Sequence, residues 1–234
     1  MSDALRNNAI EELNAHLRDI IQWHFSPETG CPFWLEWKDQ KRIDPRERVE
    51  TIEDLTLFKG FDAKELRSLP HEQWIPRGYA KTPYKVFETG GTTGAPIQRL
   101  SWEDHLSDYT LFSSCLSGNG FPKGSNWLIL GPTGPRRLRL SMEHLANIRG
   151  GSAYHVDLDP RWVRKCIAKG QLDIAEAYLD HVVGQGQRLI ETRNIQCIFT
   201  TPAIIEALAF RLDLSKAGIK GVLLGGTTLS PQAQ

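Results

Sequence analysis

The segment "FETGGTTGAPIQR", residues 87–99, is rich in glycine and threonine and is the part of the sequence best suited to chemistry. Glycines let backbone N–H groups approach a ligand closely, and hydroxyl groups add donors, a combination that suits a polyphosphate. The P-loop motif GxxxxGK[ST] does not fit, because no lysine follows Gly94. GxGxxG does not fit either, because Gly90 and Gly91 are adjacent. A flexible surface turn is the other interpretation.

The residues after 100 alternate between predicted helices and short apolar strands. The sequence predicts strands at 126–131, 152–159, 195–201 and 219–226. A first helix is expected from Ser101, as its N-cap, to Gly118, and others at 142–151, 160–170, 173–194 and 202–214. Gly184 and Gly186 would weaken the helix at 173–194. Short apolar strands that do not alternate are typical of a parallel sheet buried on both faces. We therefore expect an α/β fold, a mostly parallel sheet layered with helices.

Three of these strands end in small or hydroxylated residues. The segments are "GPTGP" at 131–135, "TTP" at 200–202 and "GGTTLSP" at 225–231. Ligands of open α/β sheets bind outside the carboxyl ends of the strands. The three loops are therefore predicted to meet at one edge, where the loop at 87–99 could join them.

The first 80 residues have a different character. An amphipathic helix is predicted at 3–24, and Phe33, Trp34 and Trp37 are expected to pack a small aromatic core, with a ligand-facing role as the alternative. Short helices are expected at 51–55, with Thr51 as N-cap and Asp54 as a weak capping partner, and at 62–70. Residues 1–80 are thus predicted to be a helical and irregular segment that packs on an α/β portion at 81–234.

Composition limits the partners and the compartment. Lysine and arginine balance aspartate and glutamate at 28 each, so nothing favours nucleic acid or an anionic membrane surface. The four cysteines are scattered, no stretch approaches 18 apolar residues, and the N-terminus is too polar for a secretory signal. These features predict a cytoplasmic protein with reduced thiols.

Three segments resemble motifs of the adenylate-forming superfamily, in the correct order. "TGGTTGAPIQ" resembles its phosphate loop, and "LLGGTTLSP" at 223–231 resembles the GGExLSP segment that borders the adenine. "FTTPAIIEALA" at 199–209 looks like the strand and helix that line the acyl pocket. The resemblance covers about residues 80–234, and the wider pattern is closest to the phenylacetate–CoA ligase branch.

This resemblance implies a two-step reaction. A small-molecule carboxylic acid attacks the α-phosphate of ATP, with Mg, to give an acyl-adenylate and pyrophosphate. A thiol, on coenzyme A or on the phosphopantetheine of a carrier protein, then takes the acyl group. The resemblance implies that the β- and γ-phosphates are bound by Thr89, Gly90, Gly91, Thr92, Thr93 and Gly94, with Thr92 and Thr93 as hydroxyl donors. It implies that Gly225, Gly226 and Thr227 border the adenine.

The sequence departs from the family pattern in several places. Ile97 stands where many members have a lysine, although Arg99 lies nearby and could supply charge. Thr227 replaces the usual glutamate. Arg136, Arg137 and Arg139 could face an acidic substrate or a phosphate, or could form a solvated basic turn.

The resemblance ends before the motifs that would complete the enzyme. It implies that this chain is the N-terminal portion of an adenylating enzyme, truncated before the magnesium-binding glutamate and before the C-terminal lid domain with its catalytic lysine. Such a portion is expected to be poorly active unless a second chain completes the site. One alternative is a non-catalytic module that binds nucleotide or acyl group, or only a partner. Another is an unrelated phosphate-binding α/β enzyme with a similar loop.

The remaining polar residues suggest no other chemistry. The seven histidines show no metal-ligand spacing, so a zinc site is not predicted. His155 could approach the strand-end edge or could be a satisfied buried histidine. Asp157 and Asp159 would share one strand face, which does not resemble the paired carboxylates of a glycosidase.

Overall fold

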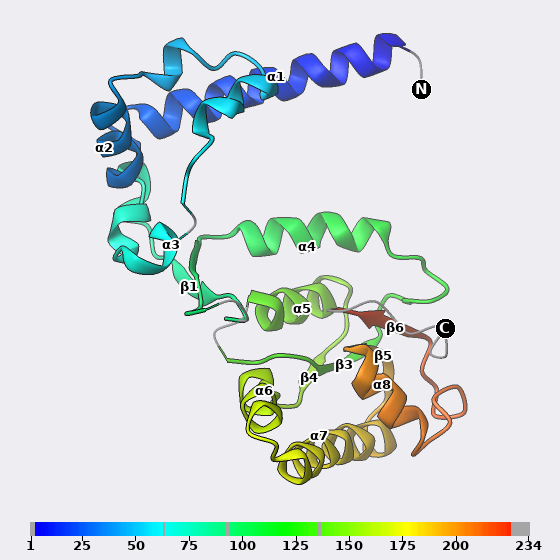
Figure 1. Cartoon of the computed structure of the whole chain (residues 1–234). Coiled ribbons are helices and arrows are strands. Elements are labelled where there is room, and N and C mark those ends of the chain that lie inside the picture. Colours follow the sequence, from blue (N-terminus) through cyan, green and yellow to red (C-terminus); the bar gives the residue numbers. More distant parts are fainter. Residues whose placement is uncertain (1–2, 63, 92–93, 135–136, 226–234) are drawn as a thin grey trace. The chain divides into compact units, whose positions relative to one another are not determined.

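The computed structural model describes residues 3–62, 64–91, 94–134 and 137–225. It forms two compact units, Met1–Trp102 and Glu103–Gln234 (Figure 1). The division after Trp102 falls some twenty residues later than the change in pattern at residue 80. Each unit is described separately below.

The first unit is mostly helical and ends in a two-stranded hairpin. Its elements are α1 (Asp3–Phe25), α2 (Pro32–Lys41), η1 (Pro45–Glu47), η2 (Ile52–Phe58), α3 (Glu65–Ser68), η3 (His71–Trp74), η4 (Arg77–Tyr79), β1 (Lys85–Glu88) and β2 (Gln98–Ser101), where η denotes a 3-10 helix. The predicted first helix and the two short helical segments after it are therefore present.

The predicted aromatic core holds the first unit together. Phe25 is buried at the end of α1, and its ring stacks on Phe58 with 5.8 Å between centroids. Trp34 and Trp37 pack against the same cluster, as expected from their spacing. Phe33 lies on another face of α2, where its ring centroid is 4.2 Å from that of Trp74. The expected capping of η2 is also present, because Asp54 accepts a hydrogen bond of 2.8 Å from the backbone N–H of Thr51.

The second unit is a three-layered α/β structure. Its elements are α4 (Asp104–Cys115), β3 (Asn126–Leu130), α5 (Arg137–Ile148), β4 (Ala153–His155), α6 (Pro160–Ala168), α7 (Leu172–Thr192), β5 (Ile195–Thr200), α8 (Pro202–Ala209) and β6 (Gly221–Leu224). The strands form one sheet in the order β4-β3-β5-β6, and all its neighbours are parallel. The α/β fold with a parallel sheet is therefore confirmed.

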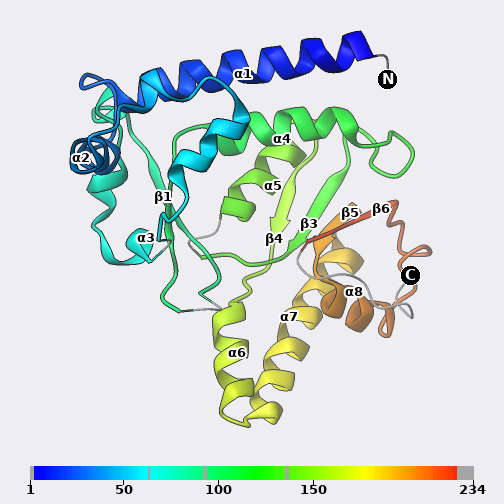
Figure 2. The same ribbon diagram turned by 45° about the horizontal axis from the view of Figure 1, so that its top comes forward.

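Both faces of this sheet are buried, which explains the unbroken apolar runs in its strands. Successive residues of β3 point to opposite faces. Leu128 and Leu130 pack with residues of α7 and α8, whereas Trp127 and Ile129 pack with α5. Figure 2 shows α5 on one side of the sheet and α7 and α8 on the other. A strand sandwiched between two helical layers needs apolar residues on both faces.

The prediction of a helix capped by Ser101 was wrong. Ser101 is the last residue of β2, where it pairs with Lys85, and α4 begins only at Asp104. A hydroxyl residue before an apolar pattern resembles a helix start, but the pairing of 98–101 with 85–88 decides otherwise. That pairing involves contacts across the loop and cannot be read from local propensity.

Several other boundaries differ from expectation. Helix α5 starts at Arg137, five residues earlier than predicted, β4 is limited to three residues, and α8 ends at Ala209, five residues earlier than predicted. Helix α7 is present as predicted and continues through Gly184 and Gly186. A Cβ at Gly186 would lie 2.9 Å from Cδ1 of Leu130, so this glycine lets α7 lie close against β3.

Candidate functional site at the carboxyl edge of the sheet

Strands β3, β5 and β6 are neighbours and end together at one edge of the sheet. Thr200, the last residue of β5, pairs with Leu130 of β3 on one side and Leu224 of β6 on the other. Its hydroxyl donates a hydrogen bond of 3.0 Å to the Leu130 carbonyl, and its own carbonyl accepts one of 2.9 Å from Gly225. The strand order therefore brings the first residues of the three loops together at one edge of the sheet. The sequence analysis predicted this meeting, and it is confirmed for those loop residues that the structure describes.

Two glycines close this edge over one aromatic ring. A Cβ at Gly131 would lie 2.6 Å from Cε1 of Phe199, and a Cβ at Gly225 would lie 2.9 Å from its Cζ. Phe199 is 3% exposed and belongs to the core on the α5 side. Packing on Phe199 is thus a sufficient reason for glycine at both positions. The predicted contact of Gly225 with adenine stays a prediction, and Gly226 and Thr227 lie outside the described residues.

The loop after β3 is also tied to the segment that follows β4. The backbone N–H of Thr133 donates to the Leu158 carbonyl at 3.2 Å, and the Leu158 N–H donates to the Thr133 hydroxyl at 3.3 Å. Asp159 then caps α6 by accepting a bond of 2.8 Å from the N–H of Arg161. Together with the bonds of Thr200, these contacts link the ends of β3, β5 and β6 to the segment after β4, a feature that the sequence analysis missed.

His155 ends β4 in a half-buried position beside charged groups. Its Nε2 lies 3.7 Å from a carboxylate oxygen of Glu143, too far for a hydrogen bond. Neither ring nitrogen has a hydrogen-bond partner among the described residues, so the alternative of a satisfied buried histidine is wrong. Burial lowers the pKa of His155, and the nearby charge of Arg139 lowers it further, whereas Glu143 and Asp157 raise it.

We expect the folded chain to lose stability on mild acidification partly through His155. Its folded pKa lies below that of an unfolded histidine, about 6.5, so the unfolded state binds more protons in the window just below that pH. Stability therefore rises with pH through this window. Titration of the His155 ring by NMR should give a midpoint below that of the same ring in urea. An equal or higher midpoint in the folded chain would contradict this expectation.

Of the arginines after β3, Arg137 has structural partners. It opens α5, and its guanidinium lies 3.1 Å from the Asp104 carboxylate and also pairs with Asp108, both on α4. Arg139 lies two residues further along the same helix, near His155. Neither belongs to a solvated turn, because both are helical, and Arg137 joins two helices. Arg136 lies outside the described residues.

The glycine- and threonine-rich loop joins β1 to β2 in the first unit. Thr89 closes it: its N–H donates to the Ile97 carbonyl, and its hydroxyl accepts from the Ile97 N–H, both at 2.9 Å. The side chain of Arg67 donates to the Ala95 carbonyl at 3.0 Å. The loop therefore leads into a strand and not directly into a helix as expected, so no helix N-terminus follows it.

Two glycines in this loop adopt backbone angles that other residues avoid. Gly91 has φ of 70°, and a Cβ there would lie 3.1 Å from the ring of Pro96 and 3.2 Å from the Gly94 carbonyl. Gly94 has φ of 143°. Both positions favour glycine because of conformation, and Gly91 also because of space. Thr92 and Thr93, the predicted hydroxyl donors, lie outside the described residues.

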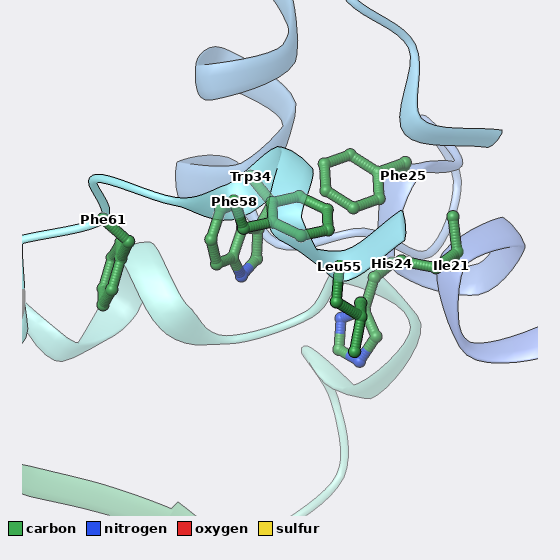
Figure 3. A pocket seen from close by; sticks show the side chains of 7 residues that line it. All are labelled: Ile21, His24, Phe25, Trp34, Leu55, Phe58 and Phe61. Carbon is green, nitrogen blue, oxygen red and sulfur yellow. The ribbon is translucent and has the colours of Figure 1, made fainter. Parts of the chain in front are cut away.

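The first unit also contains an aromatic cavity of about 440 Å3. Figure 3 shows its lining side chains, which are Ile21, His24, Phe25, Trp34, Leu55, Phe58 and Phe61. His24 is the one polar member, and burial lowers its pKa. This cavity offers apolar contact and a single neutral imidazole, which supplies no group for activating a carboxylate.

Comparison with known proteins finds similarity at the level of structure alone. No protein-family model matches the sequence, and no curated protein matches it. A solved structure of 2-hydroxyisobutyryl-CoA ligase with 2-HIB-AMP and CoA is 15% identical, with a TM-score of 0.53 over 93% of this chain and 48% of that one. The same ligase with R3-HIB-AMP, in the postadenylation state, is 16% identical, with a TM-score of 0.57 over 97% and 44%.

The chain has the α/β fold of part of 2-hydroxyisobutyryl-CoA ligase. It spans about half the length of these solved structures. At this identity the likeness describes the fold, and activity does not follow from it.

Two searches of the described residues give no further site. No three side chains of histidine, cysteine, aspartate or glutamate come together there as a candidate metal centre. No helix in that part of the chain is both long and apolar enough to cross a membrane.

Proposed function

We propose that this chain is part of an enzyme that activates a carboxylic acid with ATP. The carboxylate attacks the α-phosphate, forming an acyl-adenylate and releasing pyrophosphate. The sulfur of a thiol then attacks the acyl carbon, which gives a thioester, AMP and a proton. The thiol is that of coenzyme A or of the phosphopantetheine on a carrier protein.

The observation that carries this proposal is the place of the motif-like segments in the fold. The segment 199–209 spans the end of β5 and helix α8, and Gly225 follows β6 directly beside it. Both therefore lie at the carboxyl edge of a parallel sheet, where ligands of such folds bind. The fold is shared with ligases solved with acyl-AMP ligands, which supports this assignment.

The chain's own residues would mainly bind and orient the nucleotide. In the loop that Thr89 and Ile97 close, backbone N–H groups and the hydroxyls of Thr92 and Thr93 would neutralise charge on the departing pyrophosphate. Gly225, Gly226 and Thr227 would border the adenine. Holding the carboxylate in line with the α-phosphate removes much of the entropic cost of the reaction.

The remaining details of the reaction are part of the same proposal. Magnesium, when bound, would neutralise phosphate charge, but the described residues contain no cluster that would hold it, so no step here depends on it. The substrate is proposed to be an aryl or arylacetyl acid, as in the phenylacetate–CoA ligase branch. The described cysteines are all free thiols, which is consistent with a cytoplasmic setting.

We expect the double variant Thr92→Ala/Thr93→Ala to lose roughly 100-fold in ATP–pyrophosphate exchange, because each hydroxyl would contact the leaving group. Exchange should be measured with a panel of carboxylic acids, in this chain and in any longer natural form of it. Thr56→Ala/Thr82→Ala, which changes two exposed threonines outside the loop, is the matched control.

The outcomes separate the proposal from its main alternative. Full exchange in the loop variant would overturn the role of Thr92 and Thr93. Detection of acyl-AMP with any acid would exclude a non-catalytic module. Absence of MgATP binding and of acyl-AMP with every acid would instead favour that module.

A further inference from the structure

A second cavity of the first unit, of about 320 Å3, lies against strand β2. Its lining includes the rings of Trp74 and Trp102 with Leu100, and the polar side chains of Gln98, Arg99 and His71. The volume lies near the lower end of the range for small-molecule sites, about 300–1,000 Å3. It suits a molecule of one or two rings.

Arg99 is the group that gives this cavity a charge preference. It is exposed on β2, opposite Phe87 in the hairpin, and its guanidinium has no hydrogen bond or ion pair with any residue of the described part. His71 differs, since its Nε2 already lies 3.2 Å from the Tyr84 hydroxyl and 3.3 Å from the Glu72 carboxylate. Arg99 therefore stays available for an anion.

The two tryptophans add donors that lack acceptors. The indole N–H groups of Trp74 and Trp102 are buried, and neither has a hydrogen-bond partner among the described residues. A buried donor without a partner is costly and calls for an explanation. Both nitrogens have almost no accessible surface, so a ligand oxygen reaches these donors only when a ring shifts.

The rings themselves supply a flat apolar surface. Trp102 contacts Tyr79 and Tyr84, with distances of 5.0 and 5.9 Å between ring centroids. Trp74 belongs to η3, which packs on β2. A planar ring can stack on such walls while a charged group at its edge reaches the guanidinium.

We propose that this cavity binds a small aromatic carboxylate, held by Arg99 through its carboxylate and by Trp74 and Trp102 through its ring. A neutral aromatic molecule fits less well, because it leaves the guanidinium without a partner. The aromatic cavity described above differs in this respect, as no cation lines it. The proposal is independent of any reaction at the strand ends and holds whether or not the chain activates an acid.

The test uses benzoate as the probe and benzamide as its neutral match. Binding to the whole chain is followed through the indole N–H signals in nitrogen–proton NMR spectra, assigned with Trp74→Phe and Trp102→Phe. We expect saturable shifts of both indole signals with benzoate, and binding about tenfold weaker with benzamide. Arg99→Gln should weaken benzoate binding about tenfold and leave benzamide binding unchanged.

A matched variant keeps this test specific. Arg6→Gln removes an exposed arginine of α1 that does not line the cavity, so it should bind benzoate like the unaltered chain. Equal benzoate affinity in Arg99→Gln would overturn the proposal. Absence of saturable shifts at Trp74 and Trp102, or shifts confined to Trp127 in the second unit, would overturn it as well.

Discussion

Replacing Gly151 with alanine is expected to destabilise the second unit by about 3 kcal/mol. A Cβ at this position would lie 1.7 Å from the Ser125 carbonyl oxygen and 2.6 Å from its carbon. Both atoms belong to the backbone, so no side-chain rotation can relieve the overlap.

The surrounding hydrogen bonds make a backbone shift costly. Ser152 accepts a bond of 2.8 Å from the N–H of Trp127, and its own N–H donates to the Asn126 side chain at 3.1 Å. Gly151 itself donates to the Ala146 carbonyl at 3.0 Å. Moving this segment away from Ser125 would therefore strain the point where β3 and β4 begin to pair.

Hydrogen exchange at the amides of β3 and β5 would measure this effect within the second unit. Gly118→Ala is the control, because a Cβ at Gly118 meets no atom within 4 Å. We expect faster exchange in Gly151→Ala and little change in Gly118→Ala. Equal protection in the two variants would contradict the steric explanation.

The second large effect is expected at Arg149, where methionine should cost about 3 kcal/mol, because it removes hydrogen bonds from a charged donor to buried acceptors. The guanidinium is buried, with the residue 5% exposed. It donates to the Ser113 carbonyl at 2.8 Å, to the Ser113 hydroxyl at 3.2 Å, and also to the Phe121 carbonyl. Truncation would leave buried carbonyl oxygens without donors, which is the costly part of losing a hydrogen bond.

Arg149 holds together three segments that precede the sheet or follow α5. Ser113 lies near the end of α4, and Phe121 lies in the loop before β3, stacked on Trp127 with 5.5 Å between ring centroids. The loss in free energy of unfolding would be measured by urea unfolding, monitored at the amides of β3 and β5. Arg188→Met, at an exposed position of α7, is the control and should stay within about 0.5 kcal/mol of the parent chain. A comparable loss in the control would contradict the role of Arg149.

The local sequence pattern was sufficient to predict most helices and strands of the second unit. Pro160 and Pro202 open helices in the structure, as prolines at a first helical position predict. Apolar runs such as "NWLIL" predicted strands buried on both faces, since side chains alternate between the two faces of a strand and both faces of such a run are apolar. The alternation of these signals was enough to predict a parallel sheet.

The same reasoning failed where contacts between residues far apart in the sequence determine the local structure. Residues 98–101 become a strand only through pairing with 85–88, so the segment after the loop was mistaken for the start of a helix. The helix that contains Gly186 was predicted, but the contact of this glycine with Leu130, which lets α7 lie close against β3, was not. The neighbouring sequence of the segment 98–101 does not indicate that it pairs with 85–88, and that of Gly186 does not indicate that it contacts Leu130.

For the candidate site, the sequence determined the chemistry available, and the tertiary structure determined what lies together. Glycine, threonine and proline at three strand ends were visible in the sequence, because turns and close packing restrict residue types locally. The strand order β4-β3-β5-β6 then placed Gly131, Thr200 and Gly225 side by side. The buried hydrogen bonds of Arg149 could not be foreseen, nor could the lack of a hydrogen-bond partner for His155 among the described residues. Both depend on side chains that the folded backbone brings together from helices and strands far apart in the sequence.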